Sequence, residues 1–336
     1  MLPETSPRIG RRSMLLGMSM AGLAALTGCA RNDDPAEGQG DAWRYTDDRG
    51  VELGLAARPS RIVAFTGSAA VLADYGLQDR LVGVFGDATT ASGARSELAG
   101  NLDLGRVRVL GNRWGEFDVE RYAMLEPDLL VTDTYGDGAL WYVPDDRKTK
   151  LLTVNPNVVA IAAAHRSMPL TIERYAQLAQ GLGADLGAPA MVSDRDRFEA
   201  ASSAVRAAAT ANPGVRVLAA SGAPNLLYIA DPRISSDLGY FRELGVNIVV
   251  PDKVDAGGTF EALSWENADK YQADLILLDD RSTALQSDAL AANPVWRSLP
   301  AVRDNRITPW SPVYRFSHPG TTPLLERLAT ALRPAT

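Results

Sequence analysis

The sequence predicts an α/β protein made of two similar lobes that a long helix connects. Three observations lead to this fold class: short apolar strands alternate with helical segments, the strand-helix-strand pattern occurs twice, and a long helical pattern separates the two copies. Strands that alternate with helices favour parallel sheets, because each helix carries the chain back to the same edge. The 336-residue chain is long enough for two such lobes, each with its own core.

The N-terminal residues predict an export signal with a lipid attachment site. Arg11 and Arg12 precede an apolar run from Met14 to Leu26, and the run leads into Thr-Gly-Cys at Cys29. As a helix this run would span roughly 20 Å, whereas a bilayer core needs about 30 Å, so it does not predict a membrane anchor. We therefore predict that residues 1–28 are a twin-arginine signal peptide of the lipoprotein type. Cys29 would be the diacylated first residue of the mature chain, held at the outer face of the cell membrane, with residues 29–42 as a flexible tether.

The first lobe is predicted to cover residues 43–187 and the second lobe residues 212–336. Residues 61–65 and 81–84 have the composition of strands, and residues 69–75 between them that of a helix. The pattern recurs: residues 216–222 match residues 61–67 as a basic residue, a short apolar strand and a Thr/Ser-Gly turn. We favour two homologous lobes, and the alternative is two unrelated units that share a common pattern.

The connection between the lobes is predicted to be a helix at residues 188–211. Met191, Phe198 and Val205 lie at helical spacing, and the pattern stops at Asn212-Pro213-Gly214, a strong termination signal. A helix of this length would extend roughly 33 Å, enough to pass from one lobe to the other. We therefore expect a rigid connection.

Composition excludes several classes of function. The net charge of -7 and the scattered basic residues argue against a nucleic-acid partner. Cys29 is the single cysteine, so no internal disulfide or thiolate metal site can form, and two histidines are too few for an imidazole cage around a bare metal ion. No nucleophile motif or phosphate loop appears, so we expect a binding protein and not an enzyme; Asp279 and Asp280 form a carboxylate pair, but an Asp after a strand commonly caps a helix.

At this point six motifs, in order along most of the chain, carry a family resemblance. They resemble those of the ferric-siderophore-binding lipoproteins of ABC importers, a class of helical-backbone substrate-binding proteins. The motifs are the lipobox at Cys29, Asp47-Asp48-Arg49-Gly50, Pro59-Ser60-Arg61-Ile62-Val63, Leu125-Glu126-Pro127-Asp128-Leu129, Leu263-Ser264-Trp265-Glu266-Asn267 and Pro294-Val295-Trp296-Arg297-Ser298-Leu299-Pro300-Ala301-Val302.

The resemblance implies two Rossmann-like lobes with a ligand cleft between them. It also implies delivery of an iron(III)-siderophore complex to an ABC permease and its ATPase, with the ligand taking the place of any cofactor. We expect the protein to act as a monomer. Cobalamin or haem carriers of the same fold are the alternative.

Loops that follow strands are the places to look for the ligand site, because open α/β sheets bind ligands at the carboxyl ends of their strands. A ferric hydroxamate needs aromatic surfaces for its alkyl links and a few donors for its oxygens. The resemblance places the family's Arg at or beside Arg113 and its Tyr at Tyr135. Trp141 and Tyr142 are candidates as well, although packing against the sheet explains them equally. The first-lobe candidates are Arg113, Trp114, Tyr135, Trp141 and Tyr142.

In the second lobe the segment after the strand at residues 306–308 carries the candidates. Tyr314 and Phe316 match family positions that bear aromatic residues, with Arg315 between them. A family Trp is missing near Gly257-Gly258, and we expect Trp265 or Trp310 to replace it; packing on Phe260 is an equal alternative for Trp265. Tyr228 lies in a strand and is either a wall residue or a ligand contact.

The charge of the candidate loops favours a hydroxamate over a catecholate ligand. A trianionic ferric tris-catecholate calls for several clustered basic residues, because a buried anion without partners is costly. The loops offer chiefly Arg113 and Arg315. We therefore predict a neutral or singly positive ferric hydroxamate.

Glu120 and Glu266 occupy matching positions in the two copies, each in the first turn of a helix and eight residues before an Asp. A favourable interaction with the helix dipole explains either residue without any function. The resemblance implies a second role, in which one acidic residue per lobe meets an Arg of the permease. Both interpretations are open at this stage.

Overall fold

The computed structural model describes residues 42–333 apart from 91, 137, 256 and 282. The predicted signal peptide, Cys29 and nearly all of the tether lie outside the described residues. Within the described part of the chain, no helix has the length and apolar character needed to cross a membrane.

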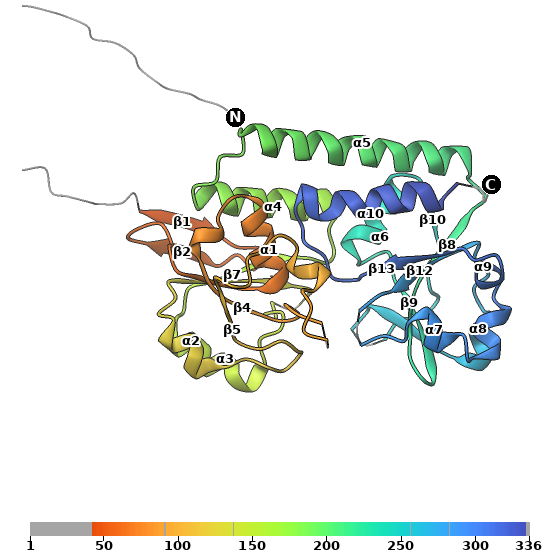
Figure 1. The fold of residues 1–336 in the computed structure, drawn as a ribbon, viewed down its shortest axis with the longest axis horizontal. Coiled ribbons are helices and arrows are strands. Elements are labelled where there is room, and N and C mark those ends of the chain that lie inside the picture. The colour runs from red at the N-terminus through yellow and green to blue at the C-terminus, as the bar shows by residue number, and fades with distance from the viewer. Residues whose placement is uncertain (1–41, 91, 137, 256, 282, 334–336) are drawn as a thin grey trace, which may run out of the picture. The chain divides into compact units, whose positions relative to one another are not determined.

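The first lobe is built on a parallel sheet of five strands in the order β5-β4-β3-β6-β7 (Figure 1). A separate antiparallel hairpin of β1 and β2 precedes this sheet. The strands are β1 (Trp43–Thr46), β2 (Glu52–Leu55), β3 (Ile62–Phe65), β4 (Leu81–Phe85), β5 (Arg108–Val109), β6 (Leu129–Thr134) and β7 (Val158–Ala162). The helices are α1 (Thr66–Asp74), α2 (Val119–Met124), α3 (Asp145–Val154) and α4 (Met168–Gly181).

The second lobe has a mixed sheet in the order β11-β9-β8-β12-β13, with β10 also paired to β8. Its strands are β8 (Arg216–Gly222), β9 (Leu226–Ala230), β10 (Asn247–Ile248), β11 (Phe260–Ser264), β12 (Leu275–Asp279) and β13 (Ile307–Trp310). Its helices are α6 (Ser236–Glu243), α7 (Ser287–Leu290), α8 (Pro294–Ser298), α9 (Pro300–Arg303) and α10 (His318–Ala331). β8, β10, β12 and β13 run parallel, whereas β9 and β11 form an antiparallel extension.

The predicted repeat appears in the strand pairing. Ile62 of β3 lies opposite Leu81 on one side and Leu129 on the other, and both pairings with this central strand are parallel. In the second lobe, Val217 of β8 lies opposite Ile248 and Leu275 in the same way. The two lobes therefore share a central three-strand unit, and the predicted α/β fold class is confirmed.

The Asp residues of the Pro-Asp-Leu and Ala-Asp-Leu segments form the same kind of hydrogen bond in the two copies of this repeat. The Asp128 carboxylate accepts hydrogen bonds from the backbone N–H groups of Ser60 and Arg61, and Asp274 accepts one from the N–H of Arg216 at 2.8 Å. Each Asp thus satisfies an N–H at the start of the neighbouring strand, which helps to set the strand register.

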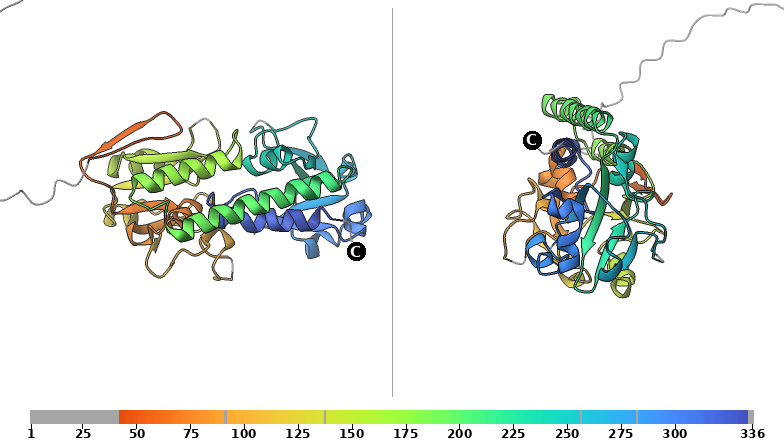
Figure 2. Two further views of the ribbon diagram at one scale, coloured as in Figure 1. Left: turned by 90° about the horizontal axis from the view of Figure 1, so that it is seen from above. Right: turned by 90° about the vertical axis from the view of Figure 1, so that its right-hand side faces the viewer.

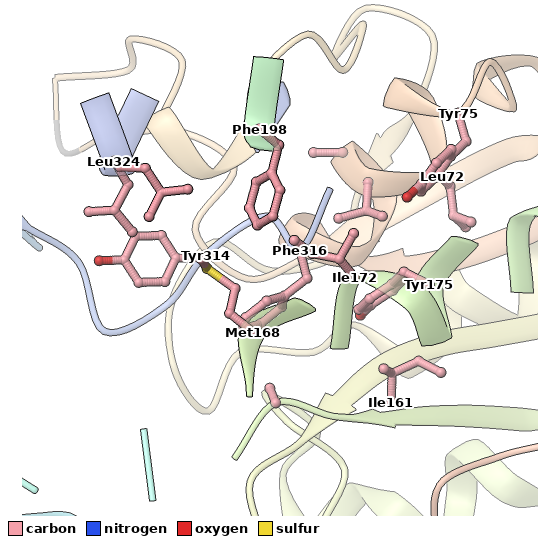
Figure 3. Packing of buried hydrophobic residues seen from close by; sticks show 14 of the residues in the cluster. Leu72, Tyr75, Ile161, Met168, Ile172, Tyr175, Phe198, Tyr314, Phe316 and Leu324 are labelled. Carbon is pink, nitrogen blue, oxygen red and sulfur yellow. The ribbon is translucent and has the colours of Figure 1, made fainter. Parts of the chain in front are cut away.

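The helix α5 (Pro189–Ala211) runs across the molecule and packs beside α10 (Figures 1 and 2). Phe198, which projects from α5, stacks on Tyr240 of α6 and meets His318 edge to face. Below it, Phe316 stacks on Tyr175 of α4, with ring centroids 6.5 Å apart, and Figure 3 shows Phe198, Phe316 and Tyr175 in one buried cluster. Apolar residues of both lobes thus meet in this core, which holds the loops between them in place.

Candidate functional site

A cavity of about 500 Å³ opens beside the loop that follows β6. Most of its wall comes from the segment between Tyr135 and Asp145, and Trp114 adds a side chain from the loop before α2. Gly257 and Thr259, which precede β11, complete the wall from the second lobe. The cavity therefore lies at the carboxyl end of a parallel strand and takes residues from both lobes, as open α/β sheets lead one to expect.

Four aromatic side chains predicted from the sequence come together on this wall. The Tyr135 and Trp141 ring centroids are 4.3 Å apart, and Trp114 lies 4.9 Å from Trp141 and 5.0 Å from Tyr142, in edge-to-face contact with each. Trp114 is 65% exposed, so its ring stands at the rim of the cavity. Such a cluster presents both ring faces and ring edges to a ligand that is partly apolar.

Tyr142 holds an uncommon backbone conformation in this cluster. Its φ of 61° lies in the left-handed region, which bulky residues rarely occupy. The Tyr142 hydroxyl donates a 2.6 Å hydrogen bond to Asp87, and its ring lies 5.1 Å from that of Phe65. Gly86 leaves room for this packing, because a Cβ there would come within 2.6 Å of the Phe65 ring. Burial, reinforced by the hydrogen bond to Asp87, raises the pKa of Tyr142 and keeps its phenol neutral. The tyrosine is thus fixed in place before any ligand arrives.

Two hydrogen-bond donors on the cavity wall are buried without a protein partner. Among the described residues, neither the Tyr135 hydroxyl nor the Trp141 indole N–H has an acceptor. Burial, with the nearby Asp133 adding to it, raises the pKa of Tyr135, so its hydroxyl remains a donor. An unsatisfied buried donor costs about 1 to 3 kcal/mol, and a ligand rich in acceptor oxygens would recover that cost.

A smaller cavity of about 60 Å³ adjoins the first and shares Tyr135 with it. Trp310, Tyr314 and Phe316 line it from the second lobe. Trp310 is completely buried, and its indole N–H donates a 2.6 Å hydrogen bond to the Asp237 carboxylate. The structure therefore brings these three predicted residues near the site, but Trp310 is also bonded within the second lobe, and Phe316 stacks on Tyr175 of the first lobe.

Arg315 does not reach either cavity. Its guanidinium forms an ion pair with Asp74 of α1 at 3.2 Å, and the Ser317 hydroxyl donates to the same carboxylate at 2.5 Å. The Asp74 carboxylate is almost fully buried and is costly to leave without a cation, so it binds the Arg315 guanidinium. Its place in the structure is that of a link between the lobes.

Three further predicted residues also lie away from the cavity linings. Arg113 is exposed beside Trp114, and Tyr228 packs edge to face on Phe260 at 6.2 Å. The Trp265 indole N–H donates to the carbonyl oxygens of Ala223 and Pro224, so this ring packs within the second lobe.

Arg281 is a basic residue near the site that the sequence interpretation missed. It follows β12, and its Nε and Nη2 atoms donate hydrogen bonds to the carboxylate of the fully buried Asp279. The shortest of these distances, from Nη2 to Oδ2, is 2.7 Å. Burial alone would lower the pKa of Arg281. The contacts with Asp279 outweigh burial and raise this pKa, and the Tyr135 and Tyr142 phenols raise it as well. The spacing Asp-x-Arg after a strand was the available signal, and it occurs again at Asp231 and Arg233 with the same geometry.

The two acidic residues of the repeat, Glu120 and Glu266, are exposed. Glu120 lies in the first turn of α2 and Glu266 in a short 3-10 helix at Trp265–Asn267. Neither glutamate lines either cavity. Among the described residues, no group of three His, Cys, Asp or Glu side chains is placed to hold a metal ion.

Comparison with known proteins agrees with this geometry. The model of a periplasmic binding protein family matches residues 62–314. DesE, a ferric-siderophore receptor protein from Streptomyces coelicolor, is 43% identical, and the alignment covers 88% of this chain and 99% of DesE with a TM-score of 0.83. No curated protein matches the chain.

More distant structures share the fold alone. FeuA from Bacillus subtilis, a triscatecholate siderophore binding protein, is 18% identical with a TM-score of 0.58, over 80% of this chain and 91% of FeuA. A periplasmic heme binding protein from Pseudomonas aeruginosa is 18% identical with a TM-score of 0.60, over 83% of this chain and 94% of its own. With the family model matching three quarters of its length and two lobes that enclose an aromatic cavity, this chain belongs to the periplasmic binding protein family.

Proposed function

We propose that this protein captures a ferric siderophore outside the cell membrane and delivers it to an ABC permease and its ATPase. The observation that carries the proposal is the aromatic cavity whose wall holds two buried, unsatisfied donors, at Tyr135 and Trp141. The similarity to DesE over almost its whole length supports the same ligand class. The role is binding and delivery by a monomer, without a catalytic step.

The ligand we propose is a ferric hydroxamate. Among the described residues that line the main cavity, none is Arg or Lys, so a trianionic complex would lack charge compensation. Hydroxamate oxygens could accept from Tyr135 and Trp141, while alkyl links would lie on Trp114 and Tyr142. Arg281, held by Asp279 in the neighbourhood of Tyr135 and Tyr142, is a candidate for a charged donor from the second lobe.

The first test compares siderophore classes. We expect a ferrioxamine-type hydroxamate to quench tryptophan fluorescence with sub-micromolar affinity, because Trp114 and Trp141 line the cavity. A ferric tris-catecholate should bind at least about tenfold more weakly, a difference of about 1.4 kcal/mol. Titration of the purified protein with both complexes measures this ratio. Equal or tighter binding of the catecholate would rule out the hydroxamate assignment and leave the family assignment in place.

Haem or cobalamin is the alternative ligand within this fold. Neither His165 nor His318 lines either cavity, so the described linings supply no imidazole to the metal of such a ligand. Absorbance spectra distinguish the cases, because a bound haem or cobalamin has intense bands that a ferric hydroxamate lacks.

We also propose that the mature protein is a lipoprotein anchored at Cys29. Replacing Cys29 by Ser removes the acylation site without changing any residue of the cavity, so the variant should bind ligand normally. It should appear in the soluble extracytoplasmic fraction, whereas the unaltered protein sediments with membranes. Membrane fractionation followed by immunoblotting makes the comparison, and a variant that stays wholly in the membrane fraction would refute the lipid anchor.

Docking to the permease is assigned in this proposal to Glu120 and Glu266. They are exposed, lie one in each lobe, and stand at equivalent places in the repeat. A pair of carboxylates, one on each lobe, suits arginine residues on the permease.

A further inference from the structure

The described lining of the main cavity carries a negative charge and no positive one. Among the described lining residues, Asp145 is the single charged side chain, and the rest of the wall is aromatic, aliphatic, glycine or Thr259. A cavity that only had to hold a neutral complex would need no carboxylate at its edge. The sign of this charge indicates which additional group on the ligand the cavity can accept.

Asp145 is free to interact with a ligand. It is the first residue of α3, it is exposed, and its carboxylate forms no hydrogen bond or ion pair within the part of the chain that the structure describes. Two other acids have partners: Asp87 accepts from Tyr142 at 2.6 Å, and Asp146 lies 3.9 Å from the Arg147 guanidinium. The helix dipole stabilises a carboxylate at this position, but it does not explain why the carboxylate lines the cavity.

The basic groups around the cavity are mostly engaged elsewhere. Arg281 is paired with Asp279, and Arg147 donates to the Phe117 carbonyl oxygen. Arg113 is exposed next to Trp114 and does not line the cavity. Among the described ion pairs, none joins Asp145 to a basic group.

The aromatic wall next to Asp145 strengthens the case for a cation. Trp114, Trp141 and Tyr142 pack edge to face with one another on the same wall. The negative face of an aromatic ring attracts an ammonium group, and the attraction grows as the group loses water. A carboxylate beside several aromatic rings is the arrangement that recognises an organic cation, and it disfavours an anion.

We propose that Asp145 and the adjoining aromatic wall receive a positively charged pendant group, such as a primary ammonium, on the ferric hydroxamate. Asp145 is then the residue that discriminates a cationic complex from a neutral one with the same iron chelate. This inference rests on the proposed function, because it concerns the ligand of the same cavity.

The test uses two ligands that differ in one charge. Ferrioxamine B carries a terminal ammonium, and its N-acetyl derivative has the same chelate without the charge. The wild-type protein should bind ferrioxamine B about fivefold more tightly than the acetylated complex. In Asp145→Asn the ratio of the two dissociation constants should fall to near one, whereas in the matched control Asp146→Asn it should stay at the wild-type value. Raising the salt concentration should reduce the wild-type ratio, because a partly exposed charge pair is screened.

The outcomes separate this inference from the function on which it rests. Equal binding of the two complexes by the wild type, or a preference that survives in Asp145→Asn, overturns the role of Asp145 and leaves hydroxamate capture intact. Loss of the preference in both variants overturns it as well, because the effect would then be one of general surface charge. Failure of both complexes to bind overturns the proposed function together with the inference.

Discussion

Replacing both Glu120 and Glu266 by Ala should abolish siderophore uptake by cells while the purified protein keeps its ligand affinity within about 1 kcal/mol. Both side chains are exposed and lie outside the cavities, so their removal leaves the ligand contacts and the core unchanged. In the proposed docking, their loss removes one contact from each lobe at once, which is why we expect the double change to have a much larger effect than either single change.

Uptake of radiolabelled iron complex by cells that produce each variant measures the effect. Glu52 and Glu326 provide the matched control, because they are also exposed glutamates, one in β2 and one in α10. The double change Glu52→Ala with Glu326→Ala alters the net charge equally and should transport normally. Normal uptake by the Glu120 and Glu266 double variant would contradict the docking role and leave both residues with only a local stabilising role at the start of a helix.

The second large effect concerns the pH dependence of stability. Asp133, at the end of β6, is fully buried and accepts a hydrogen bond from the Tyr175 hydroxyl through one oxygen only. Burial raises the pKa of Asp133 to about 7, against an ordinary value of 3.8, although the hydrogen bond from Tyr175 lowers it in part. The folded protein therefore holds a proton that the unfolded chain releases.

The direction of the effect follows from this difference in proton binding. The contribution of Asp133 to the free energy of unfolding is fully present below about pH 4 and is lost as the pH rises to about 7. Within that window stability should fall by up to about 1.4 kcal/mol for each pH unit. In Asp133→Asn this part of the slope should vanish, because the amide does not titrate.

Urea unfolding of the wild type and Asp133→Asn between pH 4 and pH 9 makes the comparison. Asp280, whose pKa burial raises to about 6, titrates in both proteins, so the difference between the two curves isolates Asp133. Tyr175→Phe serves as a second variant: without its hydrogen bond the pKa of Asp133 should rise further, and the loss of stability should extend to higher pH. Parallel stability curves for the wild type and Asp133→Asn would contradict the prediction.

Several features of this protein were accessible from local sequence patterns. The alternation of strands and helices predicted the α/β class, and the match of residues 61–67 with 216–222 predicted the common three-strand unit that the pairing of β3 and β8 shows. The aromatic residues of the loop after β6 were also found, because a ligand site at strand ends follows from parallel topology alone. Trp114, Tyr135, Trp141 and Tyr142 lie together for that reason.

The ion-pair partners of the charged side chains could not be predicted from local sequence patterns. Arg315 follows β13 and is flanked by two residues near the site, yet its partner Asp74 is 241 residues away in the sequence. Arg281 was overlooked because its orientation depends on the burial of Asp279 between β12 and its neighbours.

The sequence by itself determined the fold class, the repeat and the loops that line the main cavity, since these depend on periodicity and on residues close together in the chain. Only the tertiary structure decided which polar groups face the cavity. A buried carboxylate such as Asp74 or Asp279 binds the cation that packing brings nearest, because leaving it unpaired costs several kcal/mol. Arg315 therefore pairs with Asp74 and does not line the cavity, and Asp145 is the charged residue on the described cavity wall.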